Sequence, residues 1–298
     1  MKIGIVGLDT SHSPAFTMLL NNPEEEGHVP GCQITKAFPG GSELFYDSHS
    51  RVPEFTRQMR DDFKIEITDS IEELAADVDA ILLESVDGRQ HLEQFKILTQ
   101  YRKPVFIDKP LACSYSEAKD IIELANSADI PIMTCSSLRF AIGIRNAVSS
   151  DEKVQSCHAF GPMALLDDYR DYFWYGIHTS ELLFSIMGKG CSEVRIVQGG
   201  DYDLLTGVWE DGRIGTITGK RVEPFEYGCT LLTDKNERLI HAQRTIPWYA
   251  LLIKEIVDFF KTGKSLISID ESLEVIAFLE AASRSRAANG KAIKLKDL

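Results

Sequence analysis

Lys109 and His178 are the two side chains whose type and position best suit proton transfer. Lys109 stands in the triplet Asp108-Lys109-Pro110, directly after the apolar run Val105-Phe106-Ile107. An ammonium at the tip of an apolar strand is partly buried, and burial lowers a lysine pKa, so Lys109 is a candidate proton donor or acceptor. The alternative is an ordinary lysine in a solvated loop.

His178 begins a helix-like stretch and follows the aromatic segment Tyr169-Arg170-Asp171-Tyr172-Phe173-Trp174-Tyr175. A histidine exchanges a proton near physiological pH, so His178 is the second catalytic candidate. The alternative is a histidine packed in the core at the start of its helix. The aromatic rings either fill the core or offer a stacking surface to a sugar-like ligand.

A third group of polar side chains follows other strand-like runs. Glu84, Asp87 and His91 could join Asp9 and His12 in a polar cluster, or in a metal site. Protein metal sites usually show a compact ligand motif, and the sequence has none. We therefore expect ordinary loop residues here and predict no metal.

Strand-like and helix-like runs alternate through residues 1–136, and this alternation must position the candidates. The run Ala80-Ile81-Leu82-Leu83 is apolar on both faces, as a parallel strand between two helical layers must be. Regular alternation predicts a Rossmann-type, doubly wound parallel sheet, with ligands bound beyond the carboxyl ends of its strands. Asp69 or Ser70 should cap one of its helices. The expected strands are 3–6, 33–38, 64–68, 80–83, 105–107 and 132–134, and the expected helices are 13–20, 52–63, 71–76, 91–100 and 116–127.

Residues 137–298 have a different pattern, with a helix expected near 140–148 and then several strand-like runs. Asp211-Gly212 between two of these runs is a strong hairpin signal. The pattern predicts a second, α+β domain with a largely antiparallel open sheet, for substrate binding and oligomerisation. Helices on one face leave the other free, so two sheets can meet in a homodimer or homotetramer. The further strands are expected at 154–160, 193–198, 204–209, 214–218, 227–233 and 238–241, and the helices at 178–187, 248–261 and 269–288.

Composition excludes several other classes of protein. A chain of 298 residues suggests two domains, and its formal net charge of −13 disfavours nucleic acid as a partner. No apolar run is long enough to span a bilayer, and no export leader is visible at the start of the chain. The six cysteines are spread singly, which is typical of reduced thiols in the cytoplasm.

The segment Lys103–Ala112 resembles the strand that leads into Glu-Lys-Pro in the Gfo/Idh/MocA oxidoreductases, with Asp108 in place of Glu. Ser137-Leu138-Arg139-Phe140 also resembles the Arg-Phe pair that opens the family's second domain. The run from Val78 to Glu93 is similar to the family's fourth strand and the histidine that starts the next helix. The resemblance covers nearly the whole chain and is strongest at 78–140.

This resemblance implies an enzyme that uses a nicotinamide cofactor, mostly on sugars and polyols. It implies that Lys109 orients substrate and nicotinamide and relays the proton, and that the Lys109-Pro110 bond is cis. It further implies that His178, within Gly176-Ile177-His178, lies where the family's catalytic histidine acts. Arg139 would bind an anionic substrate group or pair with an acid.

The first loop departs from the family pattern. Of the Gly-x-Gly-x-x-Gly fingerprint only Gly7 is present, since Asp9 and His12 occupy the second and third glycine positions. The second glycine normally lets the backbone approach a pyrophosphate, so Asp9 adds bulk and negative charge there. Either Asp9 caps the following helix and points away, or Thr10, Ser11 and His12 supply new hydrogen bonds to a phosphate.

Two further departures bear on cofactor and catalysis. No acid follows Phe38 to hold ribose hydroxyls, which permits NADP with Ser42 and Arg51 near the extra phosphate. The family often has Asp four residues before the histidine, where this chain has Trp174. A catalytic pair then needs Asp171 or Glu181 as a substitute.

We therefore predict an NAD(P)-dependent oxidoreductase that acts on CH–OH groups of a sugar, polyol or related hydroxylated metabolite. One alternative is a catalytically silent regulatory protein that binds a sugar or nucleotide on the same fold. Another is a lyase or hydrolase that uses a tightly held cofactor for transient oxidation. The predicted substrate residues are Arg139, Tyr175 and His178, and the predicted residues for NAD or NADP are Gly7, Asp9, Thr10, Ser11, His12, Phe38, Ser42, Ser85, Asp87, His91, Asp108 and Lys109.

Overall fold

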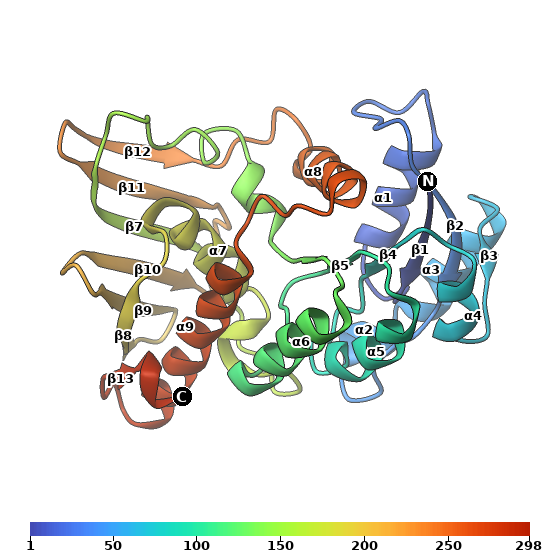
Figure 1. The fold of residues 1–298 in the computed structure, drawn as a ribbon. Coiled ribbons are helices and arrows are strands. Elements are labelled where there is room, and N and C mark those ends of the chain that lie inside the picture. The colour runs from blue at the N-terminus through green and yellow to red at the C-terminus, as the bar shows by residue number, and fades with distance from the viewer. The chain divides into compact units, whose positions relative to one another are not determined.

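Two separate sheets organise the chain in the computed structural model, which describes all 298 residues (Figure 1). The first sheet is parallel throughout and has the strand order β3-β2-β1-β4-β5-β6. This order places β1 and β4 side by side at the switch point, where a doubly wound sheet binds ligands. Its strands are β1 (Lys2–Val6), β2 (Gln33–Phe38), β3 (Glu66–Ile67), β4 (Ala80–Leu83), β5 (Val105–Ile107) and β6 (Ile132–Met133).

Amphipathic helices alternate with these strands, as the sequence pattern predicted. Ser70 caps one of them, because its side chain accepts the backbone N–H of Glu73 at 3.1 Å. Tyr46–His49 forms an additional short helix that the sequence pattern did not indicate. The helices are α1 (His12–Asn21), α2 (Tyr46–His49), α3 (Val52–Asp61), α4 (Ile71–Ala76), α5 (His91–Leu98) and α6 (Tyr115–Ala128), with a 3₁₀ turn at Thr99–Tyr101.

The second sheet has the order β12-β11-β7-β10-β9-β8-β13, and every pair in it is antiparallel except β7 with β10. Helices α7 (Gly176–Met187) and α9 (Ile269–Ala287) pack together through Phe184 and Phe278, whose ring centroids lie 5.7 Å apart. The predicted fold class, a Rossmann-type parallel sheet followed by an α+β domain with a largely antiparallel sheet, is confirmed. The strands are β7 (Val154–Pro162), β8 (Cys191–Gln198), β9 (Tyr202–Trp209), β10 (Ile214–Lys220), β11 (Gly228–Thr233), β12 (Glu237–His241) and β13 (Ile293–Lys294).

The prediction of a helix near 140–148 is wrong. A 3₁₀ turn at Ser137–Phe140 is followed by turns and a bridge between Ile142 and Gln243. Gly143 has a φ of +94°, which a right-handed helix does not allow, and a Cβ there would lie 2.8 Å from the carbonyl oxygen of His241. Close packing against the distant segment around His241 therefore overrides the apolar pattern of residues 140–148.

The chain divides into two compact units whose boundaries differ from a single cut after residue 136. The first unit contains 1–112, 116–135 and 247–269, and the second contains 113–115, 136–246 and 270–298. Helix α8 (Trp248–Thr262) belongs to the first unit because it packs on α1. Two further 3₁₀ turns, Asp171–Phe173 and Leu295–Asp297, lie in the second unit. None of the helices is long and apolar enough to span a bilayer.

Candidate functional site

Three buried ionisable side chains meet at the carboxyl ends of β1, β4 and β5. His12 Nδ1 lies 3.1 Å from Asp108 Oδ2 and 3.3 Å from Glu84 Oε2. The parallel register brings them together, since Glu84 N–H donates to Val6 O at 2.7 Å and Asp108 N–H donates to Leu83 O at 2.8 Å. The sequence analysis named all three residues, but not as one cluster.

Charge and burial oppose each other in this His12–Glu84–Asp108 cluster. Burial alone would lower the pKa of His12, but the Asp108 carboxylate raises it well above its usual value. Burial and then repulsion by Asp108 raise the pKa of Glu84 to about 7. Burial also disfavours ionised Asp108, yet the positive charges of His12 and Lys109 hold its pKa below the usual range.

The ring of His12 is fixed from its other side by aromatic packing. Its centroid lies 5.2 Å from that of Phe16 on the same helix and 4.7 Å from that of Tyr249 on α8. The side chain of His12 therefore points into the first unit and not toward solvent.

Lys109 extends the cluster at the end of β5. Its side chain is largely buried, and its Nζ lies 3.6 Å from Asp108 Oδ2. The Lys109-Pro110 peptide bond is cis, as the resemblance implied. Asp108 thus stands between the imidazole of His12 and the ammonium of Lys109.

The side chain of Asp9 points away from the N-terminus of α1 and into the interior of the first unit. Its carboxylate accepts the backbone N–H of Val86 at 3.1 Å and the Ser48 hydroxyl at 2.6 Å, and it does not cap α1. The side chain is completely buried, and this burial raises the pKa of Asp9. The alternative in which Asp9 caps α1 and points away is therefore wrong about the cap, although its carboxylate does point away from the start of α1.

A second network joins the loops after β2 and β4. The Ser42 hydroxyl donates to Asp87 Oδ2 at 2.6 Å, and Arg89 holds the same carboxylate through two nitrogens at 2.7 and 2.8 Å. Ser42 N–H also donates to the Ser48 hydroxyl at 2.7 Å. The sequence analysis overlooked Ser48 and Arg89, because nothing in their local pattern reveals which loop they touch.

Other predicted cofactor residues support these loops. His91 contacts the carbonyl oxygens of Ser85 and Leu111 at 2.7 and 3.1 Å, so both of its ring nitrogens are engaged with backbone. Gly7 N–H donates to Phe38 O at 2.9 Å, which sets the end of β2 beside the first loop. Arg51 forms an ion pair with Asp47 at 3.2 Å.

The first loop fits a dinucleotide in spite of its missing glycines. Gly7 has a φ of +101°, and a Cβ there would lie 2.4 Å from Ser85 N, so only glycine suits this position. Asp9 and His12 are both buried, so neither side chain projects outward from the first loop. Ser11 is exposed there and makes no side-chain cap bond, so its hydroxyl can donate to a phosphate.

The second unit holds the remaining candidates. His178 Nδ1 lies 2.6 Å from the hydroxyl oxygen of Ser136, and its ring centroid lies 5.9 Å from that of Tyr175. Tyr175 is partly exposed, whereas Tyr172 and Phe173 are completely buried. The aromatic segment therefore serves mainly as core, with Tyr175 as its exposed member.

Arg139 is paired with acids of its own unit. It contacts Glu181, and its Nη1 lies 2.6 Å from Glu271 Oε1. Asp171, the other acid considered as a partner for His178, lies 3.3 Å from Arg286. Ser136 is instead a hydrogen-bonding partner of His178, which the sequence analysis did not foresee.

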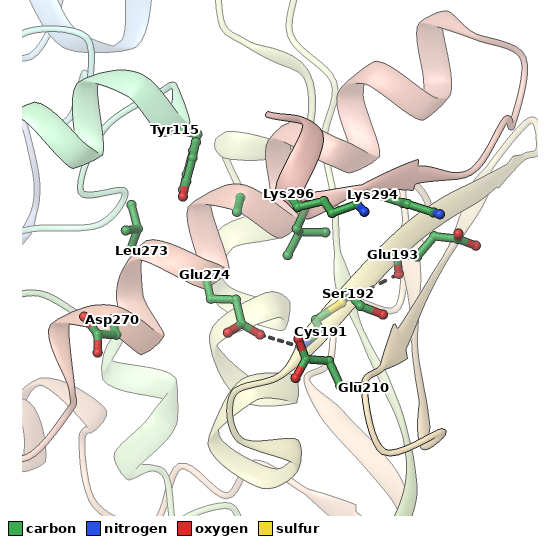
Figure 2. Close-up of a pocket in the computed structure, with 12 residues that line it drawn as sticks. Tyr115, Cys191, Ser192, Glu193, Glu210, Asp270, Leu273, Glu274, Lys294 and Lys296 are labelled. Carbon is green, nitrogen blue, oxygen red and sulfur yellow. Dashed lines mark hydrogen bonds between the residues drawn. The ribbon is translucent and has the colours of Figure 1, made fainter.

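A cavity of about 530 Å³ lies in the second unit between α9 and strands β8 and β13 (Figure 2). Glu274 points into it but accepts the backbone N–H groups of Gly190 and Cys191 at 2.8 and 2.6 Å, so its carboxylate already holds a turn. Lys294 and Lys296 also line the cavity. None of the site residues predicted from the sequence lies there.

Comparisons with known proteins assign the first domain. No curated protein matches the chain. Residues 1–134 match a family model described as "Oxidoreductase family, NAD-binding Rossmann fold", that of Gfo/Idh/MocA. This match confirms the resemblance found in the sequence.

Solved structures of similar fold cover nearly the whole chain. Myo-inositol dehydrogenase from Lactobacillus casei, in complex with NAD(H) and myo-inositol, has a TM-score of 0.78 and 15% identity, with 99% of this chain and 96% of that chain covered. Apo scyllo-inositol dehydrogenase from the same organism has a TM-score of 0.78 and 13% identity over 99% and 98% of the two chains. An Agrobacterium radiobacter oxidoreductase, in complex with NAD⁺, L-tartaric acid and magnesium, has a TM-score of 0.75 and 17% identity over 100% and 99%.

At these low identities the likeness establishes the fold alone. Residues 1–134 are therefore similar to the NAD-binding Rossmann domain of the Gfo/Idh/MocA oxidoreductases, as the match to the family model shows.

Proposed function

We propose that the chain is an NAD(P)-dependent oxidoreductase that transfers a hydride between a nicotinamide cofactor and a sugar, polyol or related hydroxylated metabolite. The observation that carries this proposal is the position of Lys109. Its buried ammonium stands at the carboxyl end of β5, beside the switch point of a domain whose family binds NAD. The nicotinamide supplies the hydride acceptor or donor when it is bound.

The residues of the first unit hold the cofactor and the reacting oxygen. The backbone of the first loop at Gly7 and the exposed Ser11 hydroxyl bind the phosphates at the N-terminus of α1. Lys109 donates a hydrogen bond to the carbinol oxygen and exchanges its proton, while Asp108 keeps the ammonium in place at 3.6 Å.

His178 is the second proposed catalytic residue, in line with the resemblance. Its ring is held by the Ser136 hydroxyl at 2.6 Å, which fixes the orientation of the imidazole. Because Ser136 is neutral, it orients His178 without the charge that an aspartate would supply. Tyr175, whose ring centroid lies 5.9 Å from that of His178, is the proposed substrate-binding residue, whereas Arg139 is already paired with Glu181 and Glu271.

The substrate class is proposed from the chemistry of the relatives. The two Lactobacillus casei enzymes are inositol dehydrogenases, and inositols are cyclic polyols. A panel of inositols, sugars and hydroxy acids, assayed with NAD⁺ and NADP⁺, therefore covers the expected substrates.

Cofactor binding is the first test of this proposal. Titration of the purified chain with NADH and NADPH, followed by fluorescence or calorimetry, should show saturable binding of at least one of them. If neither binds up to millimolar concentration, the proposal is wrong. Binding with no turnover across the panel would instead indicate the silent regulatory alternative.

Lys109→Ala tests the proposed chemistry. Positioned general acids and bases contribute roughly 10²- to 10⁴-fold, so kcat should fall by about this factor while NADH affinity changes little. Lys96→Ala is the control, since Lys96 is exposed and pairs only with a surface acid, Glu93, at 2.6 Å. Equal turnover in both variants would contradict the role of Lys109.

The open face of the second sheet is proposed as the surface that forms a homodimer or homotetramer. The strand register places Val197, Leu204, Thr218 and Phe160 in one row on that face. The residues next to this row in each strand, such as Leu205 and Ile217, point to the other face and are buried. A half-apolar sheet face of this kind is well suited to an isologous contact.

A further inference from the structure

The His12–Glu84–Asp108 cluster offers more acceptor atoms than the first unit satisfies. Glu84 Oε1 and Asp108 Oδ1 are buried and accept no hydrogen bond, whereas Asp108 Oδ2 has only the ion-pair contacts with His12 and Lys109. Buried carboxylate oxygens are otherwise almost always bonded to donors or to a cation. Two such oxygens in one place therefore point to a cation that belongs between the side chains.

We propose that His12, Glu84 and Asp108 bind one divalent transition-metal cation. One ligand atom from each residue lies within 4.8 Å of the other two. Ligand atoms bound about 2.0–2.2 Å from one ion lie roughly 3.0–3.4 Å from each other. The 3.1 and 3.3 Å distances from His12 Nδ1 to the two carboxylates already have this spacing.

The protein holds the three ligands in place without an ion. Glu84 and Asp108 are fixed by backbone hydrogen bonds to Val6 and Leu83 on neighbouring strands. His12 is fixed by its place at the start of α1 and by its contact with Tyr249. Ligands that are fixed before binding lose little conformational freedom when the ion enters.

Charge and donor type define the class of ion. Two buried carboxylates face one lysine ammonium, so their formal charges leave one negative charge in excess, which attracts a cation. An imidazole nitrogen with two carboxylates suits Mn²⁺, Co²⁺ or Zn²⁺, whereas Mg²⁺ and Ca²⁺ prefer oxygen alone. Three protein ligands leave at least one coordination position open to a small molecule.

The test is a Co²⁺ titration of the full-length chain, without a polyhistidine tag and after treatment with a chelator. We expect visible absorption bands of Co²⁺ that saturate at one equivalent and disappear when Zn²⁺ is added. Glu84→Gln and Asp108→Asn keep the side-chain shape and remove the charge. Each should weaken Co²⁺ binding by at least roughly 100-fold, since loss of supporting partners alone costs 10–100-fold.

Matched controls show where the ion binds and whether the variants fold. His49→Ala and Glu93→Gln change exposed residues of the same unit and should bind Co²⁺ as the unchanged chain does. Co²⁺ should raise the melting temperature of the unchanged chain and of both controls, but not that of Glu84→Gln or Asp108→Asn. Circular dichroism checks that all variants are folded.

Three results would overturn the proposal: absent Co²⁺ bands with no rise in melting temperature, equal affinity in the cluster variants, or binding of Mg²⁺ in preference to Co²⁺. The titration uses neither cofactor nor substrate. Failure to bind both NADH and NADPH would therefore refute the proposed function and leave this site standing, while failure to bind Co²⁺ would refute the site and leave the proposed function standing.

Discussion

At the scale of single residues, the replaced glycines of the first loop explain how the family fold accepts an unusual sequence. Asp9 and His12 would add bulk and charge beside a bound phosphate if they faced solvent. Instead Asp9 accepts two hydrogen bonds inside the unit, and His12 meets Glu84 and Asp108. The two side chains that replace glycines are therefore buried inside the unit and held by contacts with neighbouring loops and strand ends.

Asp9 yields a prediction about stability. Asp9→Ala leaves the Val86 N–H and the Ser48 hydroxyl without their acceptor, and an unsatisfied buried donor costs about 1–3 kcal/mol. Asp9→Asn keeps an acceptor for Val86 and should cost less. Urea unfolding at pH 7 measures both, and equal losses would show that these hydrogen bonds contribute nothing.

The pH dependence of stability, compared between the unchanged chain and Asp9→Asn, provides a second test. The pKa of Asp9 is raised in the folded state, so the ionised carboxylate costs stability as the pH rises through the window between the ordinary and the raised value. The asparagine variant has no such cost. The free energy of unfolding of Asp9→Asn, relative to that of the unchanged chain, should therefore be higher at pH 7 than below about pH 4.

At the scale of elements, strand ends and helix starts determine what the first unit can do. The register of β1 with β4 and of β4 with β5 aligns Gly7, Ser85 and Asp108 at the carboxyl ends of these strands. Helix α1 then begins at His12, so its first side chain meets residues that follow the other strands. One helix start and two strand ends thus suffice to assemble the cluster.

Helix α4 offers a prediction at this scale. Ser70→Ala removes the acceptor for the Glu73 N–H, and loss of such a cap costs about 1 kcal/mol. Ser70→Asp retains an acceptor and should restore most of the loss. Hydrogen exchange of the α4 amides should become faster in the alanine variant alone, and unchanged exchange would mean that packing alone holds the helix.

At the scale of the whole molecule, association through the second sheet should be sensitive to charge on its open face. Val197 and Leu239 are 64% and 61% exposed, so Leu239→Glu and Val197→Glu should not disturb the core. If this face forms the proposed homodimer, light scattering after size-exclusion chromatography should show monomer for the double variant. Glu210→Lys, a charge change at the end of the β9–β10 hairpin, is the control and should leave the mass unchanged.

The sequence by itself determined the fold class and most strands and helices, and it singled out the Asp108-Lys109-Pro110 triplet at the end of β5. These features are local, because apolar periodicity, turn residues and the Asp108-Lys109-Pro110 triplet each lie within one short window. The sequence also placed Glu84 and His12 after separate elements, but their chemistry depends on what they face. Spacing along the chain does not show which side chains Glu84 and His12 face in the folded protein.

Only the tertiary structure decided the site itself. Parallel pairing joins strands that are far apart in sequence, so it alone shows that His12 meets Asp108, that Asp9 bonds to Ser48 and Val86, and that α8 returns to the first unit. It also turned the helix expected near 140–148 into turns, since Gly143 must pass close to the backbone of His241. Contacts of this kind arise from packing between distant segments, and no local pattern encodes them.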